Sequence, residues 1–167
     1  MKSAKQTILG LTVVALLAAA STSVHAYDPK ATMADLDTRL FKIGAPKLEG
    51  SEKTGDKTVP ALYFGERKIN NNFDIVDSVR KTHSATATIF VRDGDEFIRV
   101  STNVLTPEGK RGVGTQLARN KAYESLIKGE QYCGPIDVLG TPFDACYNAI
   151  KNSGGKIIGA SYIGHKK

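Results

Sequence analysis

Few side chains of this sequence have the types and spacing that catalysis requires. His83 and His165 are the histidines of the folded part of the chain, and two are too few for a three-ligand zinc site. Residues 159–163 have the outline of a nucleophile elbow but end in Ile instead of Gly and fall in a predicted strand. Residues 112–117 lack the third glycine of a dinucleotide loop, and the acidic residues of 93–96 fall at a solvated hairpin tip. The sequence therefore indicates no catalytic residue, no metal site and no cofactor.

The two cysteines, Cys133 and Cys146, are spaced for a cross-strand disulfide. Residues 131–138 and 141–151 have the pattern of two strands, with Leu and Gly at 139–140 between them. With a two-residue turn at 139–140, the numbers of paired residues sum to 279, so the two cysteines lie opposite each other. They fall at a non-hydrogen-bonded pair, where side chains approach most closely. Metal binding or a catalytic thiol would need further ligands or a paired histidine, which the sequence does not supply.

A polar stripe along a predicted strand is the strongest indication of a binding site. In residues 96–104, Arg99 and Ser101 alternate with apolar residues and are expected to share one face. The hairpin register also opposes Tyr132 and Tyr147 on the face away from the cysteines. Aromatic rings with hydroxyl tips beside an arginine suit a small-molecule pocket. Two alternatives stay open: Arg99 on a solvated face, and ordinary core tyrosines.

The N-terminus has the layout of a cleavable signal peptide. Lys2 and Lys5 precede an apolar run of about 13 residues at 8–20, and Val-His-Ala at 24–26 offers small residues where a signal peptidase reads. The alternative is a membrane anchor, but the run is shorter than the roughly 20 residues that a spanning helix needs. We expect cleavage after Ala26 and a periplasmic or secreted product.

The remaining residues, 27–167, are expected to form a single soluble domain. Removal of 1–26 leaves 141 residues with 21 basic and 17 acidic side chains, a net charge of +4. The basic clusters at 66–68 and 165–167 show none of the interleaved aromatic residues of a nucleic-acid interface, so we interpret them as solvated surface. The length suits one hydrophobic core, and the compartment favours the disulfide.

Hydrophobic periodicity divides the domain into a helical first part and a β-rich second part. A helix is predicted at 29–42, a mobile connection at 44–58, a short strand or hairpin at 59–69, and a second helix at 73–83. The second part is predicted to hold a helix at 117–128 between the second and third of five strands, at 87–92, 96–104, 131–138, 141–151 and 156–165.

Several motifs, in order, carry a resemblance to a known family. They are INNNFDIVD at 69–77, ATIFVRDGDEFIRVSTN at 87–103, GKRGVGT at 109–115, LARN at 117–120, AY at 122–123, GEQYCG at 129–134 and IIGASYIG at 157–164. Each motif is weak alone, but their order and spacing are specific. The chain resembles, over about residues 59–165, the fused single-Cache (Cache type 3/type 2) sensor domains of bacterial chemoreceptors.

The resemblance implies an α+β, PAS-like fold. In such a fold a five-stranded antiparallel sheet carries N-terminal helices on one face and a ligand pocket on the other. It further implies that the excursion between the second and third strands forms a lid that brings Arg119 and Tyr123 to the pocket. These domains are extracytoplasmic and bind small molecules, often short carboxylates or amino acids, and an arginine suits a planar carboxylate. The expected ligand-binding residues are Arg99, Ser101, Arg119, Tyr123, Tyr132 and Tyr147.

The sequence departs from the family pattern in three respects. Its N-terminal helix is shorter than that of membrane-bound receptors, the cysteines are not part of the pattern, and the chain ends at Lys167, where a receptor would enter a membrane helix. We therefore expect a stand-alone exported binding module that passes its signal to a partner such as a membrane receptor or sensor kinase. The alternative is an exported enzyme or structural accessory protein on a PAS-like scaffold.

Overall fold

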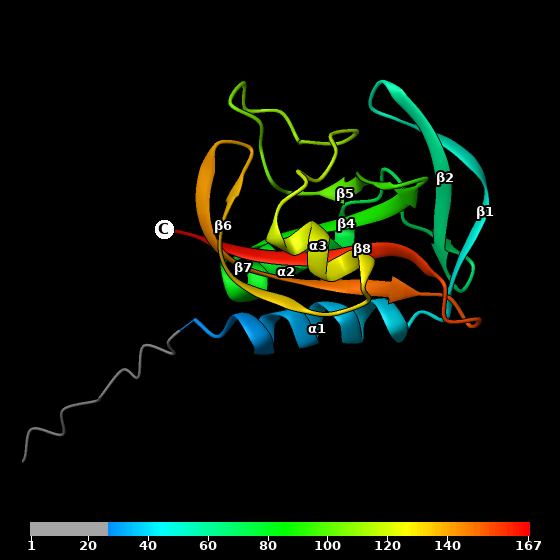
Figure 1. The fold of residues 1–167 in the computed structure, drawn as a ribbon, viewed down its shortest axis with the longest axis horizontal. Coiled ribbons are helices and arrows are strands. Elements are labelled where there is room, and N and C mark those ends of the chain that lie inside the picture. The colour runs from blue at the N-terminus through cyan, green and yellow to red at the C-terminus, as the bar shows by residue number, and fades with distance from the viewer. Residues whose placement is uncertain (1–26) are drawn as a thin grey trace, which may run out of the picture.

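The structure, a computed structural model, describes residues 27–167, so the predicted signal peptide lies outside the described residues. Within that range three helices and eight strands follow one another along the chain (Figure 1). They are α1 (Pro29–Phe41), β1 (Pro46–Thr54), β2 (Lys57–Phe64), β3 (Arg67–Lys68), α2 (Asp74–His83), β4 (Thr86–Asp93), β5 (Glu96–Thr102), α3 (Lys121–Ile127), β6 (Tyr132–Val138), β7 (Thr141–Lys151) and β8 (Ile157–Lys166).

The five strands predicted from the second part of the sequence form one antiparallel sheet. Their order is β5-β4-β8-β7-β6, so the last strand of the chain lies in the centre of the sheet. The β4–β5 hairpin turns at Asp-Gly, where Gly94 adopts the left-handed conformation that a tight hairpin turn requires. With helices on both faces, the sheet confirms the predicted α+β, PAS-like architecture.

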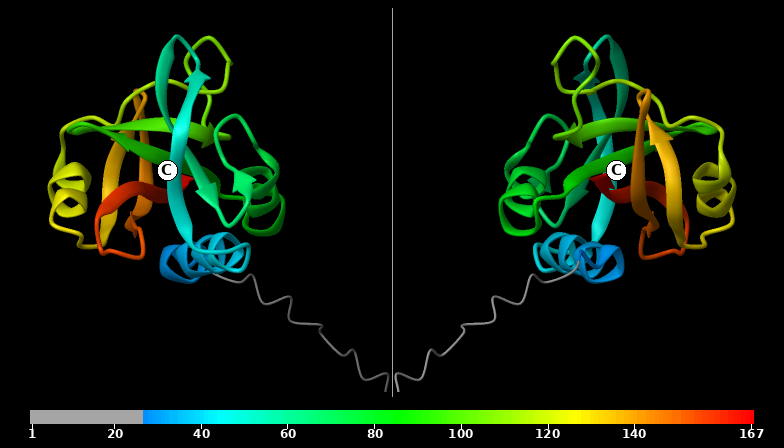
Figure 2. Two further views of the ribbon diagram at one scale, coloured as in Figure 1. Left: turned by 90° about the vertical axis from the view of Figure 1, so that its right-hand side faces the viewer. Right: turned by 90° about the vertical axis from the view of Figure 1, so that its left-hand side faces the viewer.

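Helix α1 forms where the sequence supplies a start signal and one apolar stripe. The Asp28 side chain accepts hydrogen bonds from two backbone N–H groups of the first turn, and Pro29 occupies a position that needs no N–H donor. Met33, Leu36 and Leu40 are at most 1% exposed. Their burial holds α1 along one face of the sheet (Figure 2).

The main sheet separates two hydrophobic clusters. The first cluster joins the sheet to α1, α2 and β2 and includes Ile89 of β4. The second cluster lies on the opposite face, includes Phe90 of β4, and is covered by α3 and by the chain between β5 and α3. Because neighbouring residues of a strand point to opposite faces, each strand contributes to both clusters.

The prediction of a mobile connection at 44–58 is wrong. Most of this segment belongs to the β1–β2 hairpin, which with β3 forms a separate three-stranded sheet. Most positions of β1 are exposed, so charged residues fill them and leave little apolar periodicity to detect. At the hairpin tip the added Cβ of a non-glycine residue at Gly55 would lie 2.8 Å from the carbonyl oxygen of Val113, so the tip packs against the chain beyond β5.

The helix predicted at 117–128 is shorter in the structure. Asn120 caps α3 by accepting hydrogen bonds from the backbone N–H groups of Ala122 and Tyr123, and Gly129 follows its end at a positive φ. The residues before the cap, including Leu117, continue an extended segment beside β5. Leu117 is buried by that segment and not by a helix.

The β6–β7 hairpin confirms the predicted register. Tyr132 pairs with Tyr147 and Cys133 with Cys146, and the two cysteines form a disulfide with their Cα atoms 4.1 Å apart. Cys146 is fully buried in the first cluster, so the disulfide faces α1. The two tyrosines belong to the opposite cluster, as predicted from alternation along the strands.

Candidate functional site

The candidate site is centred on Arg99, which lies in β5 at an edge of the main sheet. Residues 112–117 run antiparallel to this edge. The N–H of Arg99 donates to the carbonyl of Thr115, and the N–H of Gly114 donates to the carbonyl of Arg99, both at 2.9 Å. Residues 104–117 are named here the edge segment: its last residues, 114–117, pair with β5 through the backbone, while its earlier residues form a loop closed by the pairing of Leu105 with Arg111.

The Arg99 side chain is buried although it is charged. It is 3% exposed, and its hydrogen bonds run from Nη1 to the Thr115 hydroxyl and the Gln116 carbonyl, each at 3.0 Å. Neither bond uses the side edge formed by Nε and Nη2, and Nε has no hydrogen-bond partner among the described residues. Half of the guanidinium is thus anchored, while its other edge keeps donor capacity.

Aromatic rings surround this guanidinium. Its Cζ lies 5.0 Å from the centre of the Phe90 ring, and Tyr147 lies between Phe90 and Tyr162, with ring centres 6.4 and 4.8 Å away. Burial lowers the pKa of Arg99, an effect that the two tyrosines oppose, and it raises the pKa of both tyrosines. At physiological pH the site therefore combines an arginine cation with neutral phenols.

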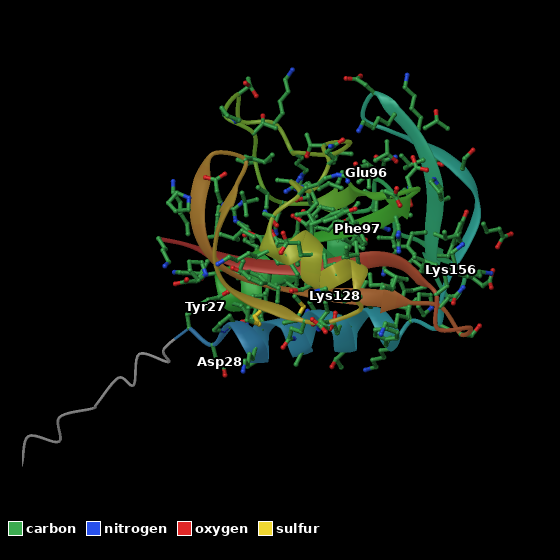
Figure 3. The ribbon with its side chains drawn as sticks, viewed as in Figure 1. Tyr27, Asp28, Glu96, Phe97, Lys128 and Lys156 are labelled. Atoms are coloured by element: carbon green, nitrogen blue, oxygen red, sulfur yellow. A yellow bond between two sulfur atoms is a disulfide. The ribbon has the colours of Figure 1, made fainter. Side chains whose placement is uncertain are left out.

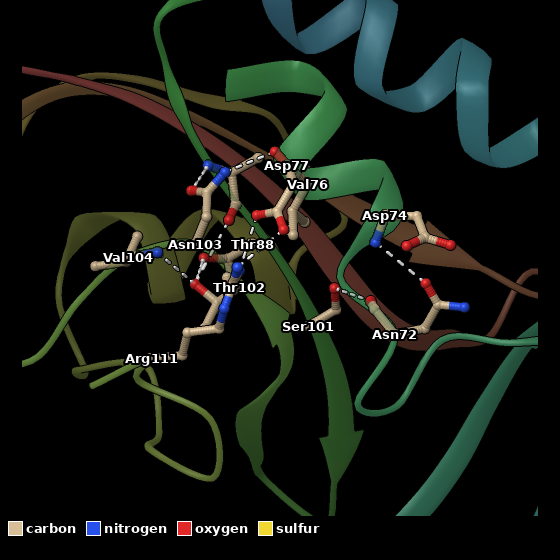
Figure 4. Close-up of polar contacts among 11 residues, drawn as sticks. Asn72, Asp74, Val76, Asp77, Thr88, Ser101, Thr102, Asn103, Val104 and Arg111 are labelled. Atoms are coloured by element: carbon tan, nitrogen blue, oxygen red, sulfur yellow. Dashed lines mark hydrogen bonds and ion pairs between the residues drawn. The ribbon is translucent and has the colours of Figure 1, made fainter. Parts of the chain in front are cut away.

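Ser101 does not share a face with Arg99, contrary to the prediction. Arg99 pairs with Phe90 and Ser101 with the adjacent Ile89, so an irregularity of register places one extra residue in β5 between them. Such a bulge inverts the alternation of side chains. The Ser101 hydroxyl accordingly donates to the carbonyl of Asn72, at the α2 side of the sheet (Figure 4).

Arg119 and Tyr123 are brought together, but at the rim of the second cluster. The Arg119 side chain is 60% exposed, pairs with Glu96 and lies 5.2 Å from the centre of the Tyr123 ring. Tyr123 is buried against Phe97, and its hydroxyl donates to the carbonyl of Asp95. These contacts attach α3 to the β4–β5 hairpin; Glu96 and Phe97, the first residues of β5, are labelled in Figure 3.

The paired tyrosines of the β6–β7 hairpin differ in burial. Tyr147 is 1% exposed beside Arg99, whereas Tyr132 is half-buried and its hydroxyl donates to the carbonyl of Pro135. Sequence reasoning missed Tyr162, which pairs with Tyr147 across β7 and β8. The pairing argument around the Gly-rich turn at 152–155 would not have found this pair, because the register of β7 and β8 shifts between Ile150 and Lys151.

A second polar network holds the edge segment to α2. Arg111 forms two hydrogen bonds with the Asp77 carboxylate and a third with the carbonyl of Thr102, all at 2.8 Å, and its Cζ lies 4.5 Å from the Phe73 ring centre. Asn103 donates to the carbonyl of Val76 (Figure 4). The edge segment is therefore fixed at one end by Arg111 and at the other by its pairing with Arg99.

An open cleft of about 740 Å³ lies between β3 and the start of α2; Arg99 does not line it, but Phe73 and Asp77 of the Arg111 network do. Its charges neutralise one another, because Lys68 pairs with Glu52 and Arg67 with Asp74, each at 2.8 Å. A cleft whose charges are already paired has little to offer a charged ligand. Arg99, with a buried and unpartnered donor, is the stronger candidate.

Among residues 27–167, no three His, Cys, Asp or Glu side chains are grouped so that they could hold a metal ion. No helix within the same range combines the length and the apolar character needed to cross a membrane.

Comparison with known proteins identifies the family. The Cache 3/Cache 2 fusion domain matches residues 16–167. Among solved structures, the sensor domain of DcuS from E. coli is similar at 17% identity and a TM-score of 0.40, over 55% of this chain and 63% of that one. No curated protein matches the chain. Since the family match spans most of the sequence, the chain belongs to the Cache 3/Cache 2 fusion domain family, whose members are extracytoplasmic sensor domains for small molecules.

Proposed function

We propose that this protein is an exported sensor module that binds a short carboxylate or an amino acid through Arg99. The observation that carries the proposal is the buried guanidinium whose Nε has no partner in the described part of the chain. A buried charged group with an unmade hydrogen bond is costly, and a ligand that completes the bond recovers that cost on binding.

The chemistry of the free edge favours a carboxylate. Nε and Nη2 present two parallel N–H groups, which match the two oxygens of a carboxylate in a bidentate pair. The hydroxyl of Tyr147 supplies a further hydrogen bond on the same face of the sheet, whereas the Tyr132 hydroxyl already donates to the carbonyl of Pro135. A cation would be repelled at this position.

Ligand entry requires movement of the edge segment. Arg99 is 3% exposed, and its Nη1 is held by Thr115 and Gln116 of that segment. The proposed ligand would therefore reach the free edge when residues 112–117 separate from β5. Arg119 and Tyr123 stand at the rim of the same cluster, where we place them as secondary contacts, and Ser101, on the other face, has no place in this site.

A thermal-shift screen of short carboxylates and amino acids tests the proposal. A ligand at about 100 times its dissociation constant stabilises the fold by about 2.7 kcal/mol, a melting shift of several degrees for a domain of this size. Arg99→Ala should abolish the shift, and calorimetry should show the same loss of binding. Arg92→Ala is the matched control, because Arg92 lies two pairs away in the same hairpin and contacts Gly94 at its tip.

Two results would contradict the assignment. One is a screen in which no carboxylate or amino acid shifts the wild-type protein. The other is a ligand whose binding survives in a folded Arg99→Ala protein. Circular dichroism of the variant separates loss of binding from loss of folding.

We further propose that the protein acts in the periplasm or outside the cell and passes its ligand state to a separate membrane receptor or sensor kinase. The support is the sensor role of its family. Ligand-dependent cross-linking to a membrane protein in intact cells, absent with Arg99→Ala, is the expected outcome. Cross-linking that ignores the ligand would contradict a signalling partner.

A further inference from the structure

A small cavity lies at the end of the sheet that holds the C-terminus, apart from Arg99. It has a volume of about 280 Å³ and lies between the last turn of α2, the β6–β7 turn and the end of β8. Three of its lining residues, Val104, Val138 and Phe143, are 3 to 5% exposed and form an apolar wall. The volume falls just below the roughly 300 Å³ at which small-molecule sites begin, so an occupant would be compact.

Two cationic side chains, Arg80 of α2 and Lys166 of β8, line the same cavity, and none of its lining residues is acidic. The acidic residues nearest to the lining along the chain are engaged elsewhere, and the exposed Asp137, next to Val138, accepts a hydrogen bond from the N–H of Gly140. Asp77 is bound by two nitrogens of Arg111, and Asp144 pairs with Lys167 at 3.0 Å. Because neither Arg80 nor Lys166 forms an ion pair within residues 27–167, the cavity carries an uncompensated positive charge.

Two polar side chains of the cavity already have hydrogen-bond partners, so few donors remain for a ligand. Asn103 donates to the carbonyl of Val76 and accepts from the N–H of Ala87. Thr86 donates to the carbonyl of Gly164, so its hydroxyl cannot also donate to a ligand. The remaining donors are the two cations and the hydroxyl of Thr141.

From these contacts we infer that the cavity is a second binding site, for a small organic monoanion: a carboxylate with a short hydrocarbon body or a single ring. The hydrocarbon part packs against Val104, Val138 and Phe143, and the carboxylate faces Arg80, Lys166 and the Thr141 hydroxyl. An inorganic anion would use the cations but leave the apolar wall unfilled. This site shares no residue with the proposed Arg99 site and is independent of it.

Benzoate, its neutral analogue benzamide, and sulfate are the probes for this inference. In a two-dimensional amide NMR titration of the wild-type protein, benzoate should shift Val104, Thr141 and their neighbours, while benzamide should not bind. Arg80→Ala/Lys166→Ala should raise the benzoate dissociation constant about tenfold or more, since two charge-assisted contacts are lost. Both side chains are exposed, so the double variant should fold normally.

A charge-matched control separates a local site from general attraction. Lys128→Ala/Lys156→Ala removes the same charge from exposed positions away from the cavity: Lys128 adjoins Gly129, which contacts Lys151 at the end of β7 opposite Thr141, and Lys156 lies at the far end of the sheet from Tyr27, which stacks on His165 next to Lys166 (Figure 3). It should leave benzoate binding within about twofold, because distant exposed charges are screened. The inference would be overturned if both double variants weakened benzoate binding equally, or if benzamide or sulfate bound as tightly as benzoate. It would also be overturned if benzoate shifted the amides of Thr115 and Gln116 instead of those near the cavity. The last result would place the anion at Arg99, so failure here is distinguishable from failure of the proposed function.

Discussion

Arg111 is the residue whose removal should loosen the cover of the Arg99 site most selectively. Its guanidinium binds both oxygens of Asp77 and the carbonyl of Thr102 at 2.8 Å, and it lies over the ring of Phe73. Arg111→Ala deletes all of these contacts at once, while the backbone pairing of Arg99 with the edge segment stays in place. The variant therefore tests whether a side-chain latch or the backbone pairing holds the segment closed.

The size of the effect follows from the exposure of the partners. The Arg111 and Asp77 side chains are 35% and 45% exposed, so their ion pair is worth at most about 1 kcal/mol despite its bidentate geometry. The stacking on Phe73 adds about 0.5–1 kcal/mol and the hydrogen bond to Thr102 about 0.5–1.5 kcal/mol. Together these contacts predict a loss of about 2 to 3 kcal/mol in the free energy of unfolding, or roughly 10 °C in melting temperature.

Denaturant unfolding measures the loss, and hydrogen exchange locates it. In Arg111→Ala the amides of residues 105–116 should exchange faster, while those of β7 and β8 change only with global stability. Arg119→Ala is the matched control, since Arg119 also combines an ion pair with an aromatic contact but is 60% exposed and lies outside the edge segment. It should cost under about 1 kcal/mol. If Arg111→Ala lowers the free energy of unfolding by less than about 0.5 kcal/mol and leaves amide exchange at 105–116 unchanged, Arg111 does not hold the edge segment in place.

Three further predictions concern other parts of the domain. Cys133→Ser and Cys146→Ser should each lower the free energy of unfolding by about 3 kcal/mol or less, with the larger loss at the fully buried Cys146; two titratable thiols in fresh protein would exclude the bridge. Burial alone would raise the pKa of Asp35, but hydrogen bonds from His83 and an arginine of α1 outweigh it and the pKa is lowered. The stabilisation is then present above the ordinary Asp pKa and lost as the pH falls below it, so Asp35→Asn should show a shallower acid loss of stability than wild type. N-terminal sequencing of protein from the periplasm should begin at Tyr27, and a soluble protein that retains residue 1 would contradict export.

The elements predicted correctly are those that local rules determine. The β6–β7 register follows from a two-residue turn, and both turn residues, Leu139 and Gly140, have the positive φ that such a turn requires. The disulfide follows from the same register. The strand or hairpin predicted at 59–69 corresponds to β2 and β3, but β1 escaped prediction because most of its residues are exposed, so its sequence shows charge and glycine where a strand is expected to alternate.

Part of the candidate site was also predicted, because alternation along a regular strand determines which face a side chain occupies. Arg99 and Tyr147 share a face because each lies on a regular stretch of its own strand. Arg119 was placed by the family resemblance as part of the predicted helix at 117–128, yet α3 begins after it, so its contact with Tyr123 depends on the loop and not on a helix. Nothing in the sequence marks the irregularity between Arg99 and Ser101, because a bulge is recorded only in the pairing with the neighbouring strand.

That bulge gives the polar residues of β5 two separate roles. Before it, Arg99 faces the second cluster and keeps an unpartnered donor, which suits ligand binding. After it, Ser101 and Asn103 donate to the backbone carbonyls of Asn72 and Val76, which fixes α2 to the opposite face. A regular strand would have aimed all three side chains at one face and left the carbonyls of Asn72, just before α2, and Val76, within it, without these donors. The extra residue therefore allows one short strand both to anchor a helix and to present a buried cation.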